Sequence, residues 1–191
     1  MKPVFTKLIK TSKSDDSVKS KDWFRDKAQE VDNVDVARVI RQNKESTETR
    51  IRLGHLYLYR YNPKLKKELP YYDKYPIVFP IDRVKNGFLG LNMHYLPIPL
   101  RAELMDGLYD YVVGSKDTTR INANYDTVSN IPSLEYYKPC VKHYLFNHIE
   151  TRFLHIDVSE WDIALFLPLQ RFLKASEQTI YRDSISIIRR G

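Results

Sequence analysis

Short hydrophobic runs separated by turn-forming residues dominate the stretch from residue 53 to residue 99, which also holds six of the ten prolines. Residues 53–61 are rich in Leu and Tyr, and their period of two predicts a strand. Three tyrosines share one face of this strand: Tyr57, Tyr59 and Tyr61. The strand is predicted to end at Pro63, because proline has no N–H for a ladder hydrogen bond and fixes φ.

Two further runs, residues 77–84 and 88–95, predict a β-hairpin. Asn86 and Gly87 lie between them, and both residues tolerate the positive φ that a tight hairpin turn requires. Pro80 lies within the first run, so we expect this strand at a sheet edge or with a bulge at the proline. The hairpin is the centre of the predicted sheet.

Helical spacing of apolar residues is clearest over residues 99–113, where leucines recur at every fourth position. Residues 139–149 carry a similar pattern, and residues 159–168 begin with a serine that suits a helix N-cap. These three segments are predicted helices. Two alternating runs, residues 153–157 and 184–188, predict strands.

The first 49 residues differ from the remainder of the chain. Residues 11–22 have few apolar side chains, which predicts an arm that is flexible when free. Apolar residues lie on both sides of this polar stretch, and short helical patterns follow it. We expect the arm to dock on a neighbouring subunit through four residues: Phe5, Leu8, Trp23 and Phe24.

These patterns together predict an α+β fold. Residues 1–49 form an extended or partly helical N-terminal arm, and residues 50–191 form a single domain. In that domain a small, mostly antiparallel sheet is built around the central hairpin, and about three helices pack on it. A chain of 191 residues is long enough for one hydrophobic core and too short for two large domains.

The net charge of +7 and the pI of about 9.3 indicate an acidic partner such as nucleic acid, or only a soluble surface. Positive and negative residues interleave along the chain, which favours the second interpretation. Cys140 is the single cysteine, so no internal disulfide is expected and synthesis in a reducing cytosol is predicted. No stretch approaches the roughly 20 apolar residues of a membrane span, so no membrane partner is expected.

The sequence offers little for catalysis, since it has no Gly-rich phosphate loop, no G-x-S-x-G and no H-E-x-x-H. Cys140 and His143 would share a helix face, but structural zinc takes four ligands and no second pair is evident. A magnesium-dependent nuclease centre is conceivable on three carboxylates: Asp73, Asp82 and Asp106. So common a residue type always permits such a choice, and we expect no cofactor, no metal and no enzymatic activity.

Basic and aromatic residues mix most densely between residues 57 and 72. We identify a candidate DNA-binding patch of five residues: Lys64, Lys66, Lys67, Tyr71 and Tyr72. Lysines neutralise phosphates, and a tyrosine ring can stack on an unpaired base at a duplex end. The alternative is a solvated lysine loop above a tyrosine-rich sheet.

Several phrases of the sequence resemble small virion proteins of T4-like contractile-tailed bacteriophages. They are YNPK at 61–64, LPYYD at 69–73, GFLGLNMHYLP at 87–97, EWD at 160–162 and YRDS at 181–184. The resemblance mainly covers residues 50–113. It implies a virion protein made in the host cytoplasm, and it carries no catalytic motif.

The leading interpretation is therefore a non-enzymatic tail, baseplate or neck component that assembles with other virion subunits in a multi-subunit particle. The alternative is a protein that binds double-stranded DNA and protects the ends of the packaged linear molecule. A nuclease is the third possibility. The arm would carry the first function, the basic and aromatic patch the second, and Asp73 the third.

Overall fold

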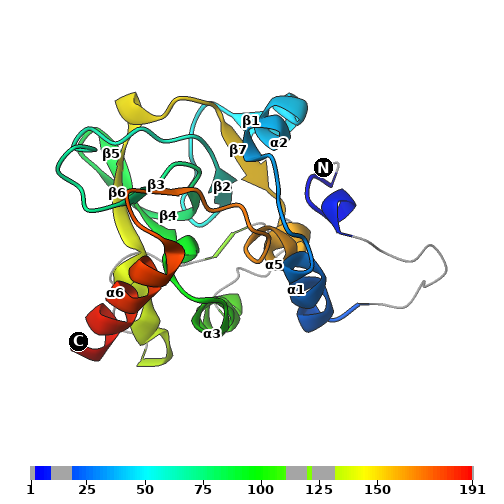
Figure 1. The fold of residues 1–191 in the computed structure, drawn as a ribbon. Helices are drawn as coiled ribbons and strands as arrows, with labels where there is room; N and C mark the ends of the chain where they lie inside the picture. Colours follow the sequence, from blue (N-terminus) through cyan, green and yellow to red (C-terminus); the bar gives the residue numbers. More distant parts are fainter. Residues whose placement is uncertain (1–2, 10–18, 111–119, 122–131, 191) are drawn as a thin grey trace.

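An antiparallel six-stranded sheet lies at the centre of the fold, with the strand order β1-β7-β2-β4-β5-β6 (Figure 1). The computed structural model describes residues 3–9, 19–110, 120–121 and 132–190. The strands of this sheet are β1 (Thr47–Glu48), β2 (Leu56–Leu58), β4 (Ile77–Val84), β5 (Gly87–Asn92), β6 (Val141–Leu145) and β7 (Phe153–Ile156). A second, two-stranded sheet pairs β3 (Tyr72–Asp73) with β8 (Phe172–Leu173).

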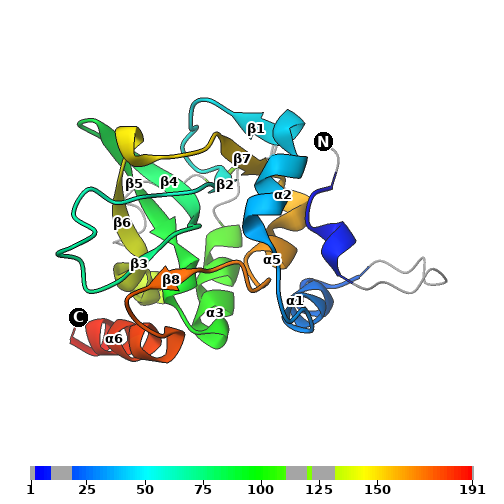
Figure 2. The same ribbon diagram turned by 45° about the horizontal axis from the view of Figure 1, so that its top comes forward.

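The described part of the chain contains five α-helices: α1 (Lys21–Gln29), α2 (Val36–Gln42), α3 (Ile98–Tyr109), α5 (Trp161–Ala164) and α6 (Glu177–Arg190). In Figure 2, α1, α2 and α5 lie at one end of the molecule and the hairpin strands β4 and β5 lie at the other. The predicted α+β class is confirmed, with more helices than the three expected. None of the described helices has the length and apolar composition needed to cross a membrane.

The sheet separates two apolar clusters, and the alternation along β2 divides its residues between them. Leu56 and Leu58 belong to the larger cluster, which contains apolar residues of α2, α3 and α5. Tyr57 and Tyr59 belong to a second cluster, here termed the aromatic cluster. Its members are Ile51, Tyr57, Tyr59, Tyr61, Val78, Phe88, Tyr144 and Phe153. The predicted alternation is confirmed, and the three tyrosine rings fill a second core.

The predicted hairpin is present, since β4 pairs with β5 along its length. Asn86 has a φ of 62°, as the turn requires. The register shifts between Pro80 and Asp82, which places the proline at a bulge. Ile81 is the extra residue of this bulge, because Pro80 is opposite Gly90 and Asp82 is opposite Leu89. β4 thus lies inside the sheet with a bulge directly after its proline, and the Pro80 carbonyl accepts a 2.7 Å bond from the Gly54 N–H.

The helix predicted over residues 139–149 is wrong. The chain forms a 3-10 helix over Pro132–Cys140 and then enters β6, which pairs with β5 from Gly87↔Leu145 to Leu91↔Val141. Apolar spacing in so short a segment fits either structure. The unpaired edge of β5 decides the outcome, because its backbone groups gain a hydrogen-bonding partner only if this segment is extended.

The strand predicted over residues 184–188 is also wrong, because these residues lie in α6. Ile180 and Ser184 are buried, and Ile188 packs against the larger cluster. These residues are four apart and form one helix face. The alternation of Ser and Ile over residues 184–188 therefore does not indicate a strand, because the buried residues follow a helical spacing that begins at Ile180. The helix predicted over residues 99–113 is confirmed by α3 as far as Tyr109, and residues 111–113 lie outside the described part. The strand predicted over residues 153–157 is confirmed by β7.

Residues 3–9, at the tip of the predicted N-terminal arm, pack on the core of their own chain. Val4 and Phe5 are buried, and their N–H groups donate to the Glu160 carboxylate at 2.8 and 2.7 Å. The Thr6 N–H adds a third bond of 2.8 Å. The segment packs on its own chain because the Glu160 carboxylate accepts hydrogen bonds from backbone N–H groups that have no acceptor within a helix turn. Residues 10–18 lie outside the described part, and the domain boundary near residue 50 stays a prediction.

Candidate nucleic-acid interface

The loop between β2 and β3 carries the lysines of the predicted DNA-binding patch. Lys64, Lys66 and Lys67 are all exposed. Residues 64–69 are termed the basic loop here, and backbone hydrogen bonds from Leu69 to Leu65 and from Lys66 to Pro63 give it a turn-like shape. The three side chains therefore lie in solvent, where their ammonium groups can meet phosphates. Lys66 Nζ donates to Asn62 Oδ1 at 3.1 Å, and this bond lies at the exposed surface.

A fourth lysine holds the backbone of the basic loop. Lys174, just after β8, donates from Nζ to the carbonyl oxygens of Lys66 at 3.2 Å and Lys67 at 3.1 Å, and also to that of Leu69. Lys174 has a φ of 77°, which is uncommon for a residue with a Cβ. Its charge is directed at the loop carbonyls and fixes the shape in which the loop presents its own lysines.

A pocket of about 430 Å³, termed the tyrosine pocket, lies between the basic loop and β6. Five tyrosines line it: Tyr61, Tyr71, Tyr72, Tyr95 and Tyr144. The ring centroids of Tyr71 and Tyr95 are 6.1 Å apart. Burial and the neighbouring Asp183 raise the pKa of Tyr71, so its hydroxyl stays protonated at neutral pH. Lys64 also lines the pocket, which therefore joins three residues of the predicted patch.

A cation on β6 completes the wall of the tyrosine pocket. Lys142 is half-buried, and its Nζ lies 4.1 Å from the ring centroid of Tyr95. Burial lowers its pKa, and among the described residues no carboxylate lies close enough to offset this. His143, the next residue, is exposed and also lines the pocket. The pocket thus offers aromatic surface beside a cation that has no anionic partner in the described chain.

The base of the tyrosine pocket is a fixed polar network around Asp73. Its carboxylate accepts from His94 Nδ1 at 2.6 Å, from the amide of Asn92 at 3.3 Å and from the Arg171 N–H at 3.1 Å. Burial by itself raises the pKa of Asp73, but His94 and the Arg171 N–H bring it below its ordinary value. Burial lowers the pKa of His94, which donates as a neutral ring. Asp73 is therefore ionised but fully engaged with donors.

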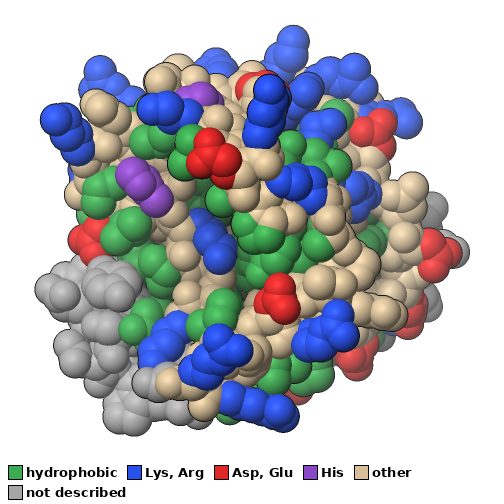
Figure 3. Space-filling view, turned by 60° about the vertical axis from the view of Figure 1, so that its left-hand side comes forward, with side chains coloured by type: hydrophobic (Ala, Val, Ile, Leu, Met, Phe, Trp, Pro, Cys, Tyr) green, Lys and Arg blue, Asp and Glu red, His purple; other side chains and the backbone are tan. Residues whose placement is uncertain are grey.

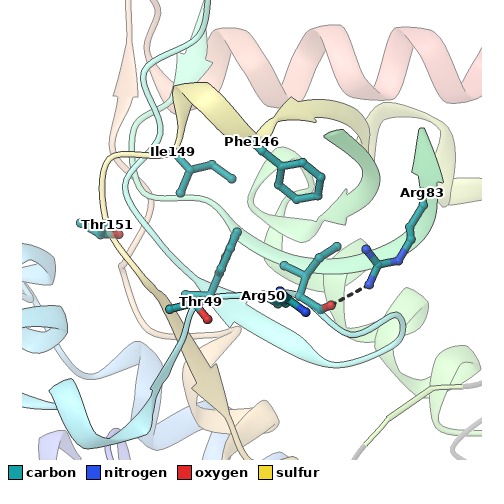
Figure 4. Close-up of a pocket in the computed structure, with 8 residues that line it drawn as sticks. Thr49, Arg50, Arg83, Phe146, Ile149 and Thr151 are labelled. Carbon is teal, nitrogen blue, oxygen red and sulfur yellow. Dashed lines mark hydrogen bonds between the residues drawn. The ribbon is translucent and has the colours of Figure 1, made fainter. Parts of the chain in front are cut away.

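Two more depressions adjoin the tyrosine pocket. One of about 510 Å³ shares Lys64 and Leu145 with it and also contains Phe146. The next, of about 520 Å³, shares Phe146 and lies between Arg50 and Arg83 (Figure 4). The Arg83 guanidinium is anchored by a 3.0 Å bond to the Ile51 carbonyl. Phe146 is 40% exposed and separates these two depressions.

Figure 3 shows the side of the molecule on which the basic loop and β6 lie. Hydrophobic side chains gather in the middle of this side, and Lys and Arg side chains surround them along the upper and lower rims. Acidic side chains are fewer here. The arrangement combines a polyanion-attracting rim with an aromatic centre.

A protein-family model for the phage T4 terminal DNA protecting protein matches residues 2–184. The chain belongs to this family. None of the curated proteins and none of the solved structures gives a significant match. The match extends the predicted resemblance to T4-like phage proteins over nearly the entire chain, and it supports the alternative interpretation, protection of DNA ends, over the tail or baseplate interpretation.

The family is non-enzymatic, in agreement with the sequence-based prediction. The three carboxylates proposed for a nuclease do not form one centre. Asp73 is bound in the network with His94, whereas Asp106 of α3 accepts bonds of 3.1 and 2.6 Å from the Arg25 guanidinium of α1. Within the described ranges, no group of three or more His, Cys, Asp or Glu side chains is arranged to hold a metal.

Cys140 and His143 do not share a helix face. Cys140 is buried at the end of the 3-10 helix, where its thiol contacts the Tyr136 carbonyl oxygen at 3.8 Å, and His143 is exposed on β6. Burial raises the pKa of Cys140 to about 12, so the thiol stays protonated. Its role is packing.

The four residues predicted to bind a neighbouring subunit lie in different environments. Phe5 is fully buried in the core of its own chain. Leu8, Trp23 and Phe24 are half-buried and pack against the same core. Phe5 thus offers no surface to a partner in this conformation, and subunit binding by the other three stays a prediction.

Five residues that line the tyrosine pocket or the depression around Phe146 are not predicted from the sequence: Lys142, His143, Tyr95, Arg50 and Arg83. The sequence predicts a helix over the segment that contains Lys142 and His143, and this prediction does not place them beside the basic loop. Arg50 lies in the connection between β1 and β2, whereas Arg83 lies in β4, and both line the depression that contains Phe146. The sequence does contain one indication for Lys142. Apolar residues surround it, so a cation lies within a segment that must be partly buried.

Proposed function

We propose that this protein protects the ends of linear double-stranded phage DNA by binding them non-covalently with the face that carries the basic loop and the tyrosine pocket. The observation that carries the proposal is the family match over residues 2–184. The face supports it independently, because the exposed lysines of the basic loop and the half-buried Tyr71 and Tyr72 lie beside Lys142 of β6, which is far from them in the sequence.

Each group has a distinct role in this proposal. The lysines of the basic loop neutralise phosphates, which supplies affinity for any DNA and makes binding weaken steeply with salt. The tyrosines contribute only where a base has an open face, because stacking requires π-surface that neighbouring base pairs otherwise cover. Preference for an end over the interior of a duplex therefore depends on the tyrosine pocket.

The test compares binding to a blunt linear duplex and to a closed circle of the same sequence over a salt series. We expect the linear form to bind at least about tenfold more tightly at moderate salt. Changing Lys64, Lys66 and Lys67 together to Gln is expected to weaken both complexes and to reduce the salt slope by about 2 to 3. Equal binding to both forms would refute end recognition.

The control removes the same charge elsewhere. Arg38, Arg41 and Lys44, which are exposed on and after α2, are changed together to Gln. This variant is expected to keep both the affinity and the linear preference. An equal loss in the control would mean that net charge, and not the basic loop, carries the binding.

A further inference from the structure

The tyrosine pocket and the two adjoining depressions form a series with shared residues. Lys64 and Leu145 belong to the first two, and Phe146 belongs to the second and third. The outer two reach the aromatic cluster, through Tyr61 and Tyr144 in one and Ile51 and Phe153 in the other. The series therefore follows one side of the sheet, past the end of β6.

All but one of the charged side chains that line this series are cationic. Its cationic side chains are Arg50, Lys64, Arg83 and Lys142, and His143 and His148 lie among them. Asp73 is the only acid among the described residues that line the three depressions, and its oxygens already accept four or more hydrogen bonds. An anionic chain that follows the series therefore meets cations and no free carboxylate among these residues.

Aromatic side chains recur along the same series. Tyr71 and Tyr95 lie at one end, Phe146 in the middle and Phe153 at the other end. Each depression, at 430 to 520 Å³, has the size of a small-ligand site and is too small to enclose a duplex. Alternating cations and aromatic rings are the features by which proteins bind a single strand without reading its sequence.

We propose that this series of depressions binds a short single-stranded terminus of DNA, with the last base in the tyrosine pocket and its phosphate beside Lys142. The inference rests on the proposed function and specifies its ligand: an unpaired strand end, and not only the blunt face of a duplex. Lys142 acts as a binding residue, since its ammonium has no anionic partner in the described chain. Its lowered pKa fits a site that an anion completes.

The experiment uses the full chain and duplexes of one core sequence that end bluntly or in single-stranded tails of one to eight thymidines of either polarity. Affinity is expected to rise with tail length and then to level off, reaching at least about tenfold over the blunt end. Tail polarity shows which strand enters the pocket. A flat response to tail length would overturn the inference.

Two variants locate the strand. Lys142→Met keeps a long side chain on Tyr95 and is expected to remove most of the gain from the tail, whereas Lys138→Met, an exposed neighbour, is expected to remove none. Phe146→Ser removes a ring that is 40% exposed, and it is expected to shorten the tail length at which affinity levels off. Unchanged tail dependence in both variants would place the strand elsewhere and refute the inference.

The two proposals fail in different ways. If end protection is wrong, blunt linear and circular DNA bind alike, whatever the tails do. If only the strand inference is wrong, the preference for linear DNA remains, but it is independent of tail length and of Lys142. Thermal unfolding of each variant shows whether a loss of binding is a loss of folding.

Discussion

The side chain of Lys174 holds the basic loop in place, a role that its position in the sequence does not indicate. Its ammonium is shared among carbonyl groups of Lys66, Lys67 and Leu69. Hydrogen bonds that involve a charged group are stronger than neutral ones, so one side chain fixes several peptide units at once. The backbone that carries the exposed lysines of the basic loop is thus held by a fourth lysine, which is also at the surface.

We therefore predict that Lys174→Met weakens DNA binding although Lys174 contacts no phosphate. The loop is expected to become mobile, so amide hydrogen exchange over residues 64–69 rises and affinity for linear DNA falls about three- to tenfold, in line with the loss of about 1 kcal/mol of loop order. The matched control is Lys44→Met, an exposed lysine in the helical turn after α2. Faster exchange without weaker binding would separate the loop from DNA recognition.

At the scale of elements, one carboxylate attaches the N-terminal segment to the fold. Glu160 accepts hydrogen bonds from the N–H groups of Val4, Phe5 and Thr6, and it is itself buried at the start of α5. Three donors on one carboxylate form an anion site of backbone amides like that at a helix N-terminus. The apolar tip that the sequence assigns to a partner is thereby held within its own chain.

Glu160→Gln is predicted to release this segment. An amide has one acceptor oxygen in place of two and brings a donor against backbone N–H groups, so we expect a loss of about 2 kcal/mol in the free energy of unfolding and rapid proteolysis near residues 3–9. Urea unfolding and limited proteolysis measure the two effects. The exposed Glu45→Gln is the control, and equal protection of residues 3–9 in both variants would contradict the role of Glu160.

For the molecule as a unit, two buried histidines make the free energy of unfolding depend on pH. His55 Nδ1 and His155 Nε2 lie 3.2 Å apart between β2 and β7. Burial, Arg52 and His155 lower the pKa of His55 from 6.5 to about 4, and burial also lowers the pKa of His155. Glu48 opposes both shifts, but it does not outweigh burial.

The sign of the effect follows from proton uptake. Below pH 6.5 the unfolded chain binds protons that the folded chain excludes, so stability is complete above about pH 6.5 and declines as the pH falls toward about 4. Each excluded proton costs up to about 1.4 kcal/mol per pH unit. Urea unfolding at pH 7 and pH 5 is expected to show this decline, His55→Gln to reduce it, and the exposed His143→Gln to leave it unchanged. A pH-independent free energy of unfolding would contradict the prediction.

Local sequence by itself determined the hairpin, the alternation of β2 and the helix α3. Asn-Gly favours the positive φ that Asn86 adopts, and a period of two or of four can be recognised from residues close together in the sequence. The basic and aromatic patch was visible for the same reason, since Lys64, Tyr71 and Tyr72 are close along the chain. These features depend on interactions within a few residues.

Tertiary structure alone decided which segments complete the fold and the interface. The segment with Lys142 becomes a strand because β5, some 50 residues earlier, has a free edge opposite it. The N-terminal tip turns inward because Glu160, more than 150 residues away, collects its N–H groups. Strand pairing and burial depend on residues far away in the sequence, which a local pattern does not identify. The lysine loop could therefore be predicted from the sequence, and the pocket beside it could not.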